Sequence, residues 1–229
     1  MSTTQLKRGG AHEKSFEDIC PNYGLKVVKQ WGSGNKNKKN NCDADFTVEI
    51  VNLKMFETIV TNKKFKTGQL LTVSCKTEKG AFTLANLGTG PSSGLYKRLL
   101  NEEENNELIM YNNEMKAYKE SIGNEKRWSE VGNDKKDFIF ELHMLFNYLL
   151  FQNRKSQEIL YDWLEERQSD LKYVGNKLYL QNSKKIPKEY IKVEMKGKNT
   201  IIIGDYRLRF KAAGGKVCSS WKINVELNQ

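Results

Sequence analysis

The chain has 229 residues, 38% of them hydrophobic, and a formal net charge of +10. This length is enough for a domain with a substantial core, and no apolar run approaches the roughly 18 residues of a membrane span. The N-terminal segment lacks the apolar stretch of a secretory signal, so the sequence predicts a cytoplasmic protein.

The charge is unevenly distributed along the chain. Residues 1–98 hold 16 basic and 8 acidic residues, residues 99–170 hold 9 and 16, and residues 171–229 hold 13 and 4. Two basic segments therefore flank an acidic one. A basic surface suits a polyanion, because Lys and Arg displace condensed counterions from phosphates. Lysine-rich surfaces also serve solubility alone, so charge by itself favours nucleic-acid binding only slightly.

The first part of the chain alternates predicted strands with polar loops. Residues 32–41 and 80–94 are predicted loops, the first basic and the second rich in Gly, Thr, Ser and Pro. The predicted regular elements are a helix over Glu13–Ile19 and strands over Leu25–Gln30, Asp45–Val51 and Gln69–Lys76.

The middle is helical and the end is strand-rich. Helices are predicted over Leu95–Tyr118 and Asp137–Gln168. An antiparallel meander is predicted over Lys177–Leu180, Tyr190–Met195, Thr200–Ile203, Tyr206–Lys211 and Ser219–Leu227. The sequence thus predicts an α/β (α+β) fold with a mixed central β-sheet flanked by helices. We expect one domain over residues 1–229, with a core in 11–96, a helical segment in 99–170 and a β-rich segment in 173–229.

Asp45 and the Ser74-Cys75-Lys76 segment have a spacing that suits phosphodiester hydrolysis. That reaction needs a divalent cation held by carboxylates, an activated water, and a cation that stabilises charge on the phosphate. Two neighbouring strands can supply these groups when one begins with an aspartate and the other ends with an acid, a spacer and a lysine. Asp45 opens its strand, and Ser74 and Lys76 share a face opposite Cys75.

On these residues the chain resembles the PD-(D/E)xK nuclease superfamily and, within it, type II restriction endonucleases. The loop GSGNKNKKNN precedes CDADFTVEI, and SCK occupies the position of the acid-x-Lys element. Seven residues separate Lys76 from Leu84-Ala85-Asn86, which resembles a Leu-x-Asn spacing of some restriction enzymes. The segment YRLRFKAAGGKVCSSWKIN is similar to their C-terminal segments.

The resemblance implies a restriction-endonuclease-like core and a bacterial cytoplasmic enzyme. Asp45 would hold Mg²⁺ together with a further acid, for which Asp43 is one metal-binding candidate, and Lys76 would position or deprotonate the attacking water. The implied substrate is double-stranded DNA with a short site, cut to a 5′-phosphate and a 3′-hydroxyl. A homodimer is implied by a two-fold symmetric site, with a monomer that cuts one strand at a time as the alternative. A cognate DNA methyltransferase is implied in the same host.

Ser74 departs from the family pattern, because a hydroxyl is a much poorer metal ligand than a carboxylate. Either one metal suffices, with Ser74 or water at that position, or another acid supplies the charge. Glu17 is the first choice for this acid and a candidate catalytic and metal-binding residue, since the family often places a glutamate on the N-terminal helix beside the site. Glu49 and Glu78 are the alternatives. Each residue, considered alone, is more typical of an ordinary surface position.

The C-terminal strands are candidates for DNA recognition. Arg207 and Arg209 alternate with apolar residues and share a face, and Arg reads guanine through two hydrogen bonds. The alternative is an exposed hairpin whose arginines only pair with acids. The other DNA-binding candidates are Lys211, Ser219, Ser220 and Lys222 after this strand, and Lys36, Lys38, Asn86, Ser92 and Ser93 in the earlier loops.

Two other functions compete with a restriction enzyme. One is a repair or junction nuclease of the same superfamily, and the other is a DNA-binding protein without a working active site, for which Ser74 argues. A zinc site is not expected, because the cysteines and histidines are scattered. Cys75 is predicted to be a core thiol, and His143 is predicted to be packed or to cap a helix.

Overall fold

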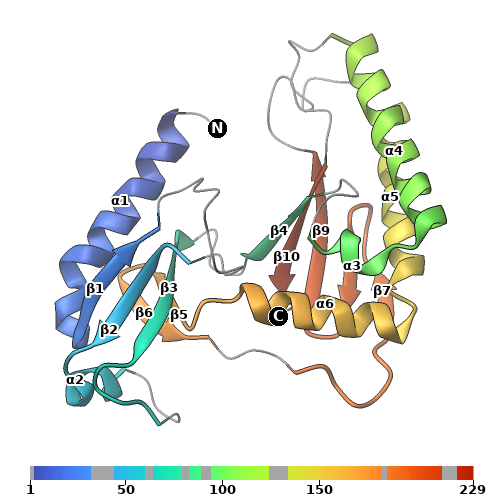
Figure 1. Ribbon diagram of the computed structural model, residues 1–229. Helices are drawn as coiled ribbons and strands as arrows, with labels where there is room; N and C mark the ends of the chain where they lie inside the picture. Colours follow the sequence, from blue (N-terminus) through green and yellow to red (C-terminus); the bar gives the residue numbers. More distant parts are fainter. Residues whose placement is uncertain are drawn as a thin grey trace. The chain divides into compact units, whose positions relative to one another are not determined.

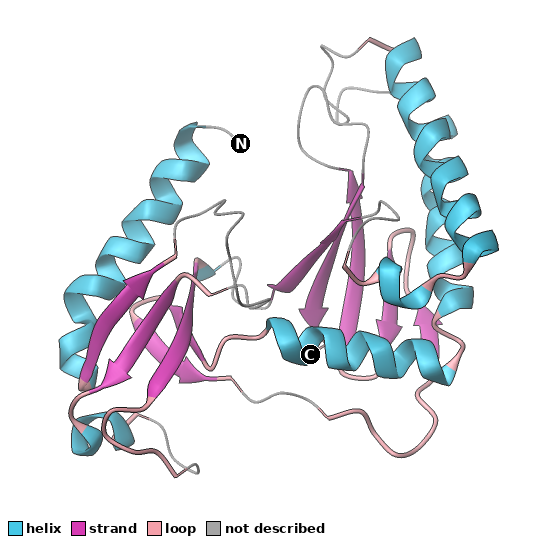
Figure 2. Cartoon of the chain, viewed as in Figure 1, coloured by secondary structure: helices cyan, strands magenta, loops and turns pink. Residues whose placement is uncertain are grey.

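The structure is a computed structural model that describes residues 3–31, 44–59, 64–78, 83–88, 94–123, 134–181, 185–212 and 221–228. The chain divides into two units, each with its own sheet and core. Unit 1 is formed by Met1–Phe82 and Glu165–Ser183, and unit 2 by Thr83–Leu164 and Lys184–Gln229 (Figures 1 and 2). The mixed α and β class is as predicted. Among the described residues, no helix combines the length and hydropathy needed to cross a membrane.

Unit 1 contains a five-stranded mixed sheet in the order β1-β2-β3-β5-β6. All neighbouring strands are antiparallel except β3 and β5, which are parallel. The last strand, β6, was predicted to join the C-terminal meander, but it pairs with β5 instead. The strands span Leu25–Gln30 (β1), Phe46–Ile50 (β2), Leu70–Lys76 (β3), Leu171–Val174 (β5) and Lys177–Leu180 (β6).

One face of this sheet packs against α1 (Thr3–Ile19), which begins well before the predicted helix. Phe16 of α1 is fully buried, with its ring centroid 5.2 Å from those of both Phe46 and Tyr173. Alternate residues of β2, Phe46, Val48 and Ile50, complete this core. Because strand side chains alternate, the intervening residues lie on the opposite face of the sheet.

The connection from α1 to β1 depends on one glycine. A 3₁₀ turn, η1 (Cys20–Tyr23), ends at Gly24, which has φ +68°. A Cβ there would lie 2.3 Å from the carbonyl oxygen of Asn52, so no other residue fits without movement. The Gly24 carbonyl accepts from the N–H groups of Val51 and Asn52, just before the short helix α2 (Leu53–Glu57).

Unit 2 contains a second five-stranded sheet, in the order β4-β10-β9-β8-β7. Strands β7 to β10 form the predicted antiparallel meander. The predicted loop at 80–94 contains a strand, β4, which pairs with β10 at the far end of the sequence. The strands span Thr83–Gly88 (β4), Val193–Met195 (β7), Thr200–Ile203 (β8), Tyr206–Ala212 (β9) and Trp221–Leu227 (β10).

Helices of unit 2 share a large apolar core with its sheet. The helices are α3 (Tyr96–Leu99), α4 (Glu102–Ser121), α5 (Asp134–Leu150) and α6 (Arg154–Arg167), of which the last continues into unit 1. The single helix predicted over 137–168 is divided in two. Asn153 starts the second helix, because its side chain accepts from the N–H of Lys155 at 2.9 Å.

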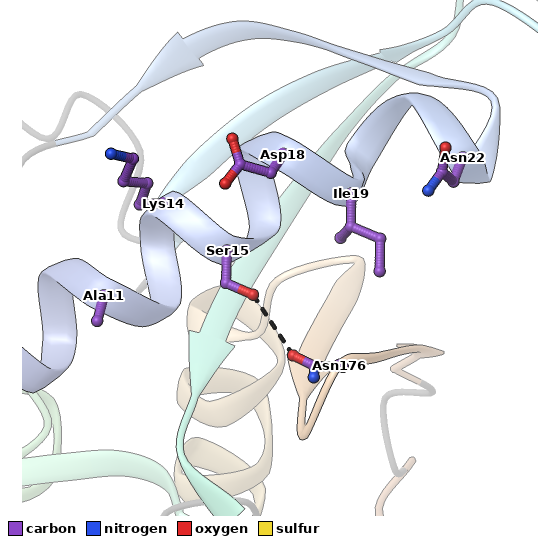
Figure 3. Close-up of a pocket in the computed structure, with 7 residues that line it drawn as sticks. All are labelled: Ala11, Lys14, Ser15, Asp18, Ile19, Asn22 and Asn176. Carbon is purple, nitrogen blue, oxygen red and sulfur yellow. Dashed lines mark hydrogen bonds between the residues drawn. The ribbon is translucent and has the colours of Figure 1, made fainter.

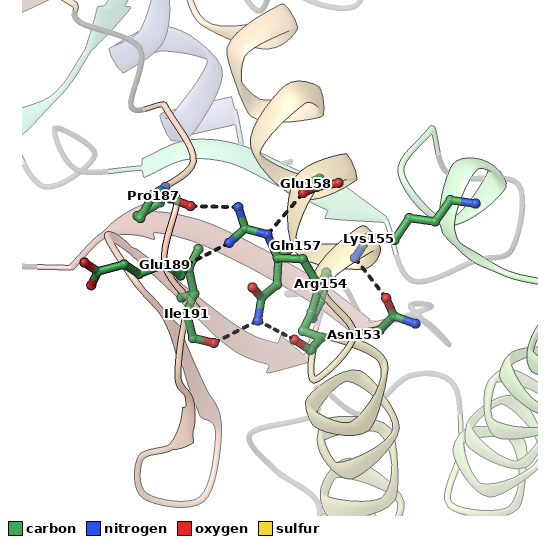
Figure 4. A network of polar contacts seen from close by, with 9 residues as sticks. Asn153, Arg154, Lys155, Gln157, Glu158, Pro187, Glu189 and Ile191 are labelled. Carbon is green, nitrogen blue, oxygen red and sulfur yellow. Dashed lines mark hydrogen bonds and ion pairs between the residues drawn. The ribbon is translucent and has the colours of Figure 1, made fainter.

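The segment before β7 is tied to α6 by polar contacts (Figure 4). The guanidinium of Arg154 donates to the carbonyls of Pro187 and Glu189 at 2.7 and 2.9 Å, and it pairs with Glu158. Gln157, which is fully buried, donates to the carbonyls of Phe151 and Ile191. This segment has no strand partners, and these side chains satisfy its carbonyls instead.

Candidate functional site

Asp45 is held at the start of β2 by hydrogen bonds to both neighbouring strands. Its N–H donates to the carbonyl of Val73 on β3, and its carbonyl accepts from the N–H of Trp31 after β1. Its carboxylate oxygen Oδ2 accepts from the N–H of Cys75 at 2.7 Å. The carboxylate therefore lies beside the residue that separates Ser74 from Lys76, as the predicted arrangement requires.

Ser74 and Lys76 lie on the face of β3 that is opposite the α1 core. Val73 is fully buried in that core and Cys75 packs against it, so the alternate residues point the other way. Ser74 is only 5% exposed, and its hydroxyl finds no hydrogen-bond partner among the described residues. Lys76 is half-buried at the strand end. The predicted face-sharing of Ser74 and Lys76 is thus observed.

The acid of α1 that interacts with Asp45 is Glu13. Its carboxylate accepts from Nε2 of Gln30 at 3.2 Å, and Gln30 pairs with Phe46, the residue after Asp45. Burial raises the pKa of Glu13, repulsion by Asp45 and, to a smaller extent, by Glu17 adds to this, and the hydrogen bond from Gln30 opposes it. Two carboxylates from two elements are thus held close enough to repel each other.

The three acids considered from the sequence occupy other places. Glu17 lies one helical turn after Glu13 and lines a surface pocket of about 400 Å³ with Cys20, Leu25 and Lys26. Glu49 pairs with Leu70, at the opposite end of β2 from Asp45. The carboxylate of Glu78 lies against Gly175, in the turn between β5 and β6.

The remaining metal candidate, Asp43, lies outside the described residues. Within the described ranges, no three His, Cys, Asp or Glu side chains form a group that could hold a metal ion. The carboxylates of Asp45 and Glu13 interact with each other and with the thiol of Cys75, the residue before Lys76. A role for Glu17 stays a prediction.

Cys75 behaves as the predicted core thiol. Burial raises its pKa far above the ordinary range, and the nearby carboxylates of Asp45 and Glu13 raise it further. A thiol that stays protonated is a poor nucleophile and a poor metal ligand. Cys20 is similar, since burial followed by repulsion from Glu17 raises its pKa to about 11.

A second lysine, Lys172 of β5, lies beside Ser74. The parallel pairing of β3 and β5 aligns Ser74 with Lys172 and Lys76 with Val174. Lys172 is 8% exposed, and burial followed by repulsion from Lys76 lowers its pKa to about 8. Sequence reasoning identified neither Lys172 nor Glu13. For Glu13, the one signal in the sequence was its spacing of four residues from Glu17, which places both glutamates on the same side of a helix.

Comparisons with family models, with curated proteins and with solved structures find no match to this chain.

A larger surface pocket of unit 1 lies apart from these residues (Figure 3). Its volume is about 530 Å³, and it is lined by α1 residues such as Lys14, Ser15 and Asp18, and by Asn176 of the turn between β5 and β6. The hydroxyl of Ser15 bonds both the phenol of Tyr173 at 3.0 Å and the side chain of Asn176 at 3.4 Å. None of Asp45, Ser74 or Lys76 lines it.

The arginines of β9 share one face of the sheet in unit 2, as predicted. Tyr206, Leu208 and Phe210 are buried in the core, and the residues between them, Arg207 and Arg209, are half-buried on the opposite face. Lys211 continues this alternation. Across the sheet, Arg209 lies opposite Asn224 and Arg207 lies opposite Glu226 of β10.

Both arginines have partners on this face. Arg209 forms an ion pair of 3.4 Å with Glu226, whose side chain is 13% exposed. Arg207 donates to the side chain of Asn228 at 3.4 Å, while its Nε is buried without a partner in the described chain. The alternative considered from the sequence, that the arginines pair with acids, therefore holds for Arg209.

The other DNA-binding candidates are described only in part. The backbone of Lys222 lies opposite Lys211, and that of Asn86 lies opposite Asn224, with their side chains outside the description. The remaining candidates, Lys36, Lys38, Ser92, Ser93, Ser219 and Ser220, lie outside the described residues.

His143 is packed in the core of unit 2, as predicted. It is 1% exposed, and its ring contacts Tyr111, Phe146 and Phe210. Burial lowers its pKa to about 3, so this histidine is neutral at neutral pH. A general base must reach substrate, and His143 does not.

Proposed function

We propose that the protein is a metal-dependent endonuclease that hydrolyses double-stranded DNA, of the type II restriction kind. The observation that carries this proposal is the hydrogen bond from the Cys75 N–H to the carboxylate of Asp45. It joins an aspartate at the start of one strand to a Ser-x-Lys segment at the end of its neighbour. This arrangement supports the restriction-endonuclease-like core that the resemblance implies.

Asp45 and Glu13 are the two carboxylates that would hold a magnesium ion. Their mutual repulsion would be removed by a divalent cation between them, and Mg²⁺ commonly uses one or two carboxylates together with waters and substrate phosphate. A bound Mg²⁺ would lower the pKa of a coordinated water and polarise the phosphate. Glu13 lies on the N-terminal helix, where the family often has a glutamate, and it takes the role first considered for Glu17.

Lys76 provides the positive charge that the chemistry needs. Lys76 is half-buried at the end of β3, next in sequence to Cys75, whose N–H donates to Asp45. In this position it would orient the attacking water and stabilise the charge that develops on the phosphate. The expected products are a 5′-phosphate and a 3′-hydroxyl. The hydrogen bond between Asp45 and Cys75 joins the start of β2 to the strand end that carries Lys76.

Unit 2 supports the proposed recognition of DNA. Arg207, Arg209 and Lys211 present cationic groups on one sheet face, next to Asn224. Arg and Asn are the side chains that read guanine and adenine through pairs of hydrogen bonds. We further propose that the protein is a homodimer that acts on a symmetric site. It would work in a bacterial cytoplasm, and a cognate methyltransferase would protect the host DNA.

A digest of a plasmid of known sequence with Mg²⁺ tests the proposal. We expect discrete fragments whose ends map to one short sequence. Asp45→Ala and Lys76→Ala should abolish cleavage and keep specific binding, measured by gel shift in Ca²⁺. Asp162→Ala and Lys177→Ala, at exposed positions on α6 and β6, are the matched controls. Wild-type turnover in either site variant would contradict this site.

A non-catalytic DNA-binding protein is the second candidate. The observation in its favour is Ser74, which puts a buried hydroxyl where the family has a carboxylate. Specific binding without cleavage in Mg²⁺, Mn²⁺ or Co²⁺ would support this candidate and contradict the nuclease. A sequence-independent digest would instead favour a repair or junction nuclease.

A further inference from the structure

Lys172 faces the same side of the sheet as Ser74 and Lys76. Its neighbours Leu171 and Tyr173 are fully buried in the α1 core, so the Lys172 side chain points away from that core. Its pairing partner in β3 is Ser74, and paired residues lie on one side of a sheet. The three residues therefore occupy adjacent positions on one face.

The register that brings Lys172 to Ser74 is fixed by side chains. The carboxylate of Asp170 accepts from both the N–H and the hydroxyl of Thr72, each at 2.8 Å. The N–H of Asp170 donates back to the Thr72 hydroxyl at 2.9 Å. These three bonds join the start of β5 to β3, two residues before Ser74 and Lys172. The position of Lys172 is thus set by the fold.

The local charge differs from that of an acid-x-Lys site. The acid is replaced by a neutral hydroxyl, and a lysine that is 8% exposed is added on the next strand. Two lysines close enough to repel each other favour an anion and oppose a second metal ion. The Ser74 hydroxyl, buried without a partner in the described chain, is a further donor for an oxyanion.

We propose that Lys172 is a second phosphate-binding lysine of the active site, which contacts the scissile phosphate together with Lys76. The proposal rests on the nuclease function. In the reaction, a water oxygen forms a bond to phosphorus, the bond from phosphorus to the 3′ oxygen breaks, and one proton passes from the water side to that 3′ oxygen. Lys172 exchanges no proton in this balance and contributes positive charge beside Ser74, the position at which the family has an acid.

The experiment compares Lys172→Met and Lys172→Arg with the wild type, and uses Lys177→Met on the adjacent strand as the control. Single-turnover cleavage of plasmid DNA in Mg²⁺ and binding of the same DNA in Ca²⁺ at several salt concentrations are measured. We expect Lys172→Met to cleave at least about 100-fold more slowly, while Lys172→Arg stays within about tenfold. The slope of log affinity against log salt should fall by about one in Lys172→Met.

Lys172→Met that cleaves within threefold of the wild type, with an unchanged salt slope, overturns the proposal and leaves the nuclease function intact. If the wild type binds DNA without cleaving it, the nuclease function is contradicted. The salt slope of Lys172→Met then still tests whether Lys172 contacts a phosphate.

Ser74→Ala is a second variant in case Lys172→Met does not fold. It removes an unpartnered hydroxyl, so its melting temperature should hold while its affinity for DNA falls severalfold. Unchanged affinity in Ser74→Ala would count against a phosphate at this position.

Discussion

The carboxylate of Asp45 accepts a hydrogen bond of 2.7 Å from the backbone N–H of Cys75, which joins the start of β2 to the end of β3. Asp45 therefore has a structural role beside the proposed catalytic one, and the two are separable. Asp45→Asn keeps an oxygen acceptor for Cys75 but loses the charge, whereas Asp45→Ala loses both.

We expect Asp45→Asn to abolish cleavage with little change in the free energy of unfolding. Asp45→Ala should also abolish cleavage and should in addition cost about 2 kcal/mol, typical of a hydrogen bond to a charged group. Cleavage assays and urea unfolding at pH 7 measure the two effects. Equal stability of the two variants would show that the bond to Cys75 contributes nothing.

A second prediction concerns the helix acid that assists Asp45. Glu13 interacts with Asp45 and is held by Gln30, whereas Glu17 lines a separate pocket one turn later. We expect Glu13→Gln to weaken Mg²⁺ binding, measured by calorimetry, and to reduce cleavage at least about 100-fold. Glu17→Gln is the matched control and should stay within a few-fold of the wild type. The reverse pattern would return the role to Glu17.

The sequence predicted the Asp45 and Lys76 arrangement because strand alternation is a local property. The sequence did not identify which acid of α1 lies near Asp45. The packing of Phe16 against Phe46 and Tyr173 determines which face of α1 meets β2. Glu13 and Glu17 are one turn apart, so both fit the sequence pattern. The sequence did not indicate Lys172, because its strand β5 pairs with β3, and most of unit 2 lies between these two strands in the sequence.

The fold errors have a similar cause. The segment around Leu84 and Leu87 is rich in turn-forming residues, and it becomes a strand because β10 provides its partner far along the chain. Strand β6 has its predicted boundaries, but it was predicted in the wrong sheet. The residue pattern of a strand does not specify which distant strand it pairs with. The arginine face of β9 was correct, since it depends on alternation within one strand.

A third prediction concerns the ion pair of Arg209 and Glu226. If Arg209 reads a base, Arg209→Ala should cost about 1–3 kcal/mol on the specific site and relax the preference at one base position. The same variant exposes the negative charge of Glu226 to DNA, which would weaken binding to every sequence. The double variant Arg209→Ala with Glu226→Gln removes that repulsion.

We therefore expect the double variant to recover non-specific affinity and to remain deficient on the specific site, as measured by gel shift on both kinds of DNA. Glu226→Gln alone should raise non-specific affinity, because Arg209 is released from its partner. Full recovery of specific binding in the double variant would show that Arg209 acts only by neutralising Glu226.

The last prediction is a pH dependence of stability caused by His143. Burial lowers the pKa of this histidine to about 3 in the folded chain, against about 6.5 when unfolded. The unfolded state therefore binds a proton more readily below pH 6.5. The stability due to neutral His143 is complete above pH 6.5 and is lost as the pH falls toward 3.

His143→Phe keeps an aromatic ring among Tyr111, Phe146 and Phe210 and removes the titrating group. Between pH 7.5 and pH 5 the wild type should lose about 2 kcal/mol of unfolding free energy relative to this variant, because each pH unit below 6.5 costs about 1.4 kcal/mol. Urea unfolding at several pH values measures the difference, and His143→Leu serves if Phe does not fit. Parallel stability curves for wild type and variants would mean that His143 has the same pKa in the folded core as in the unfolded chain.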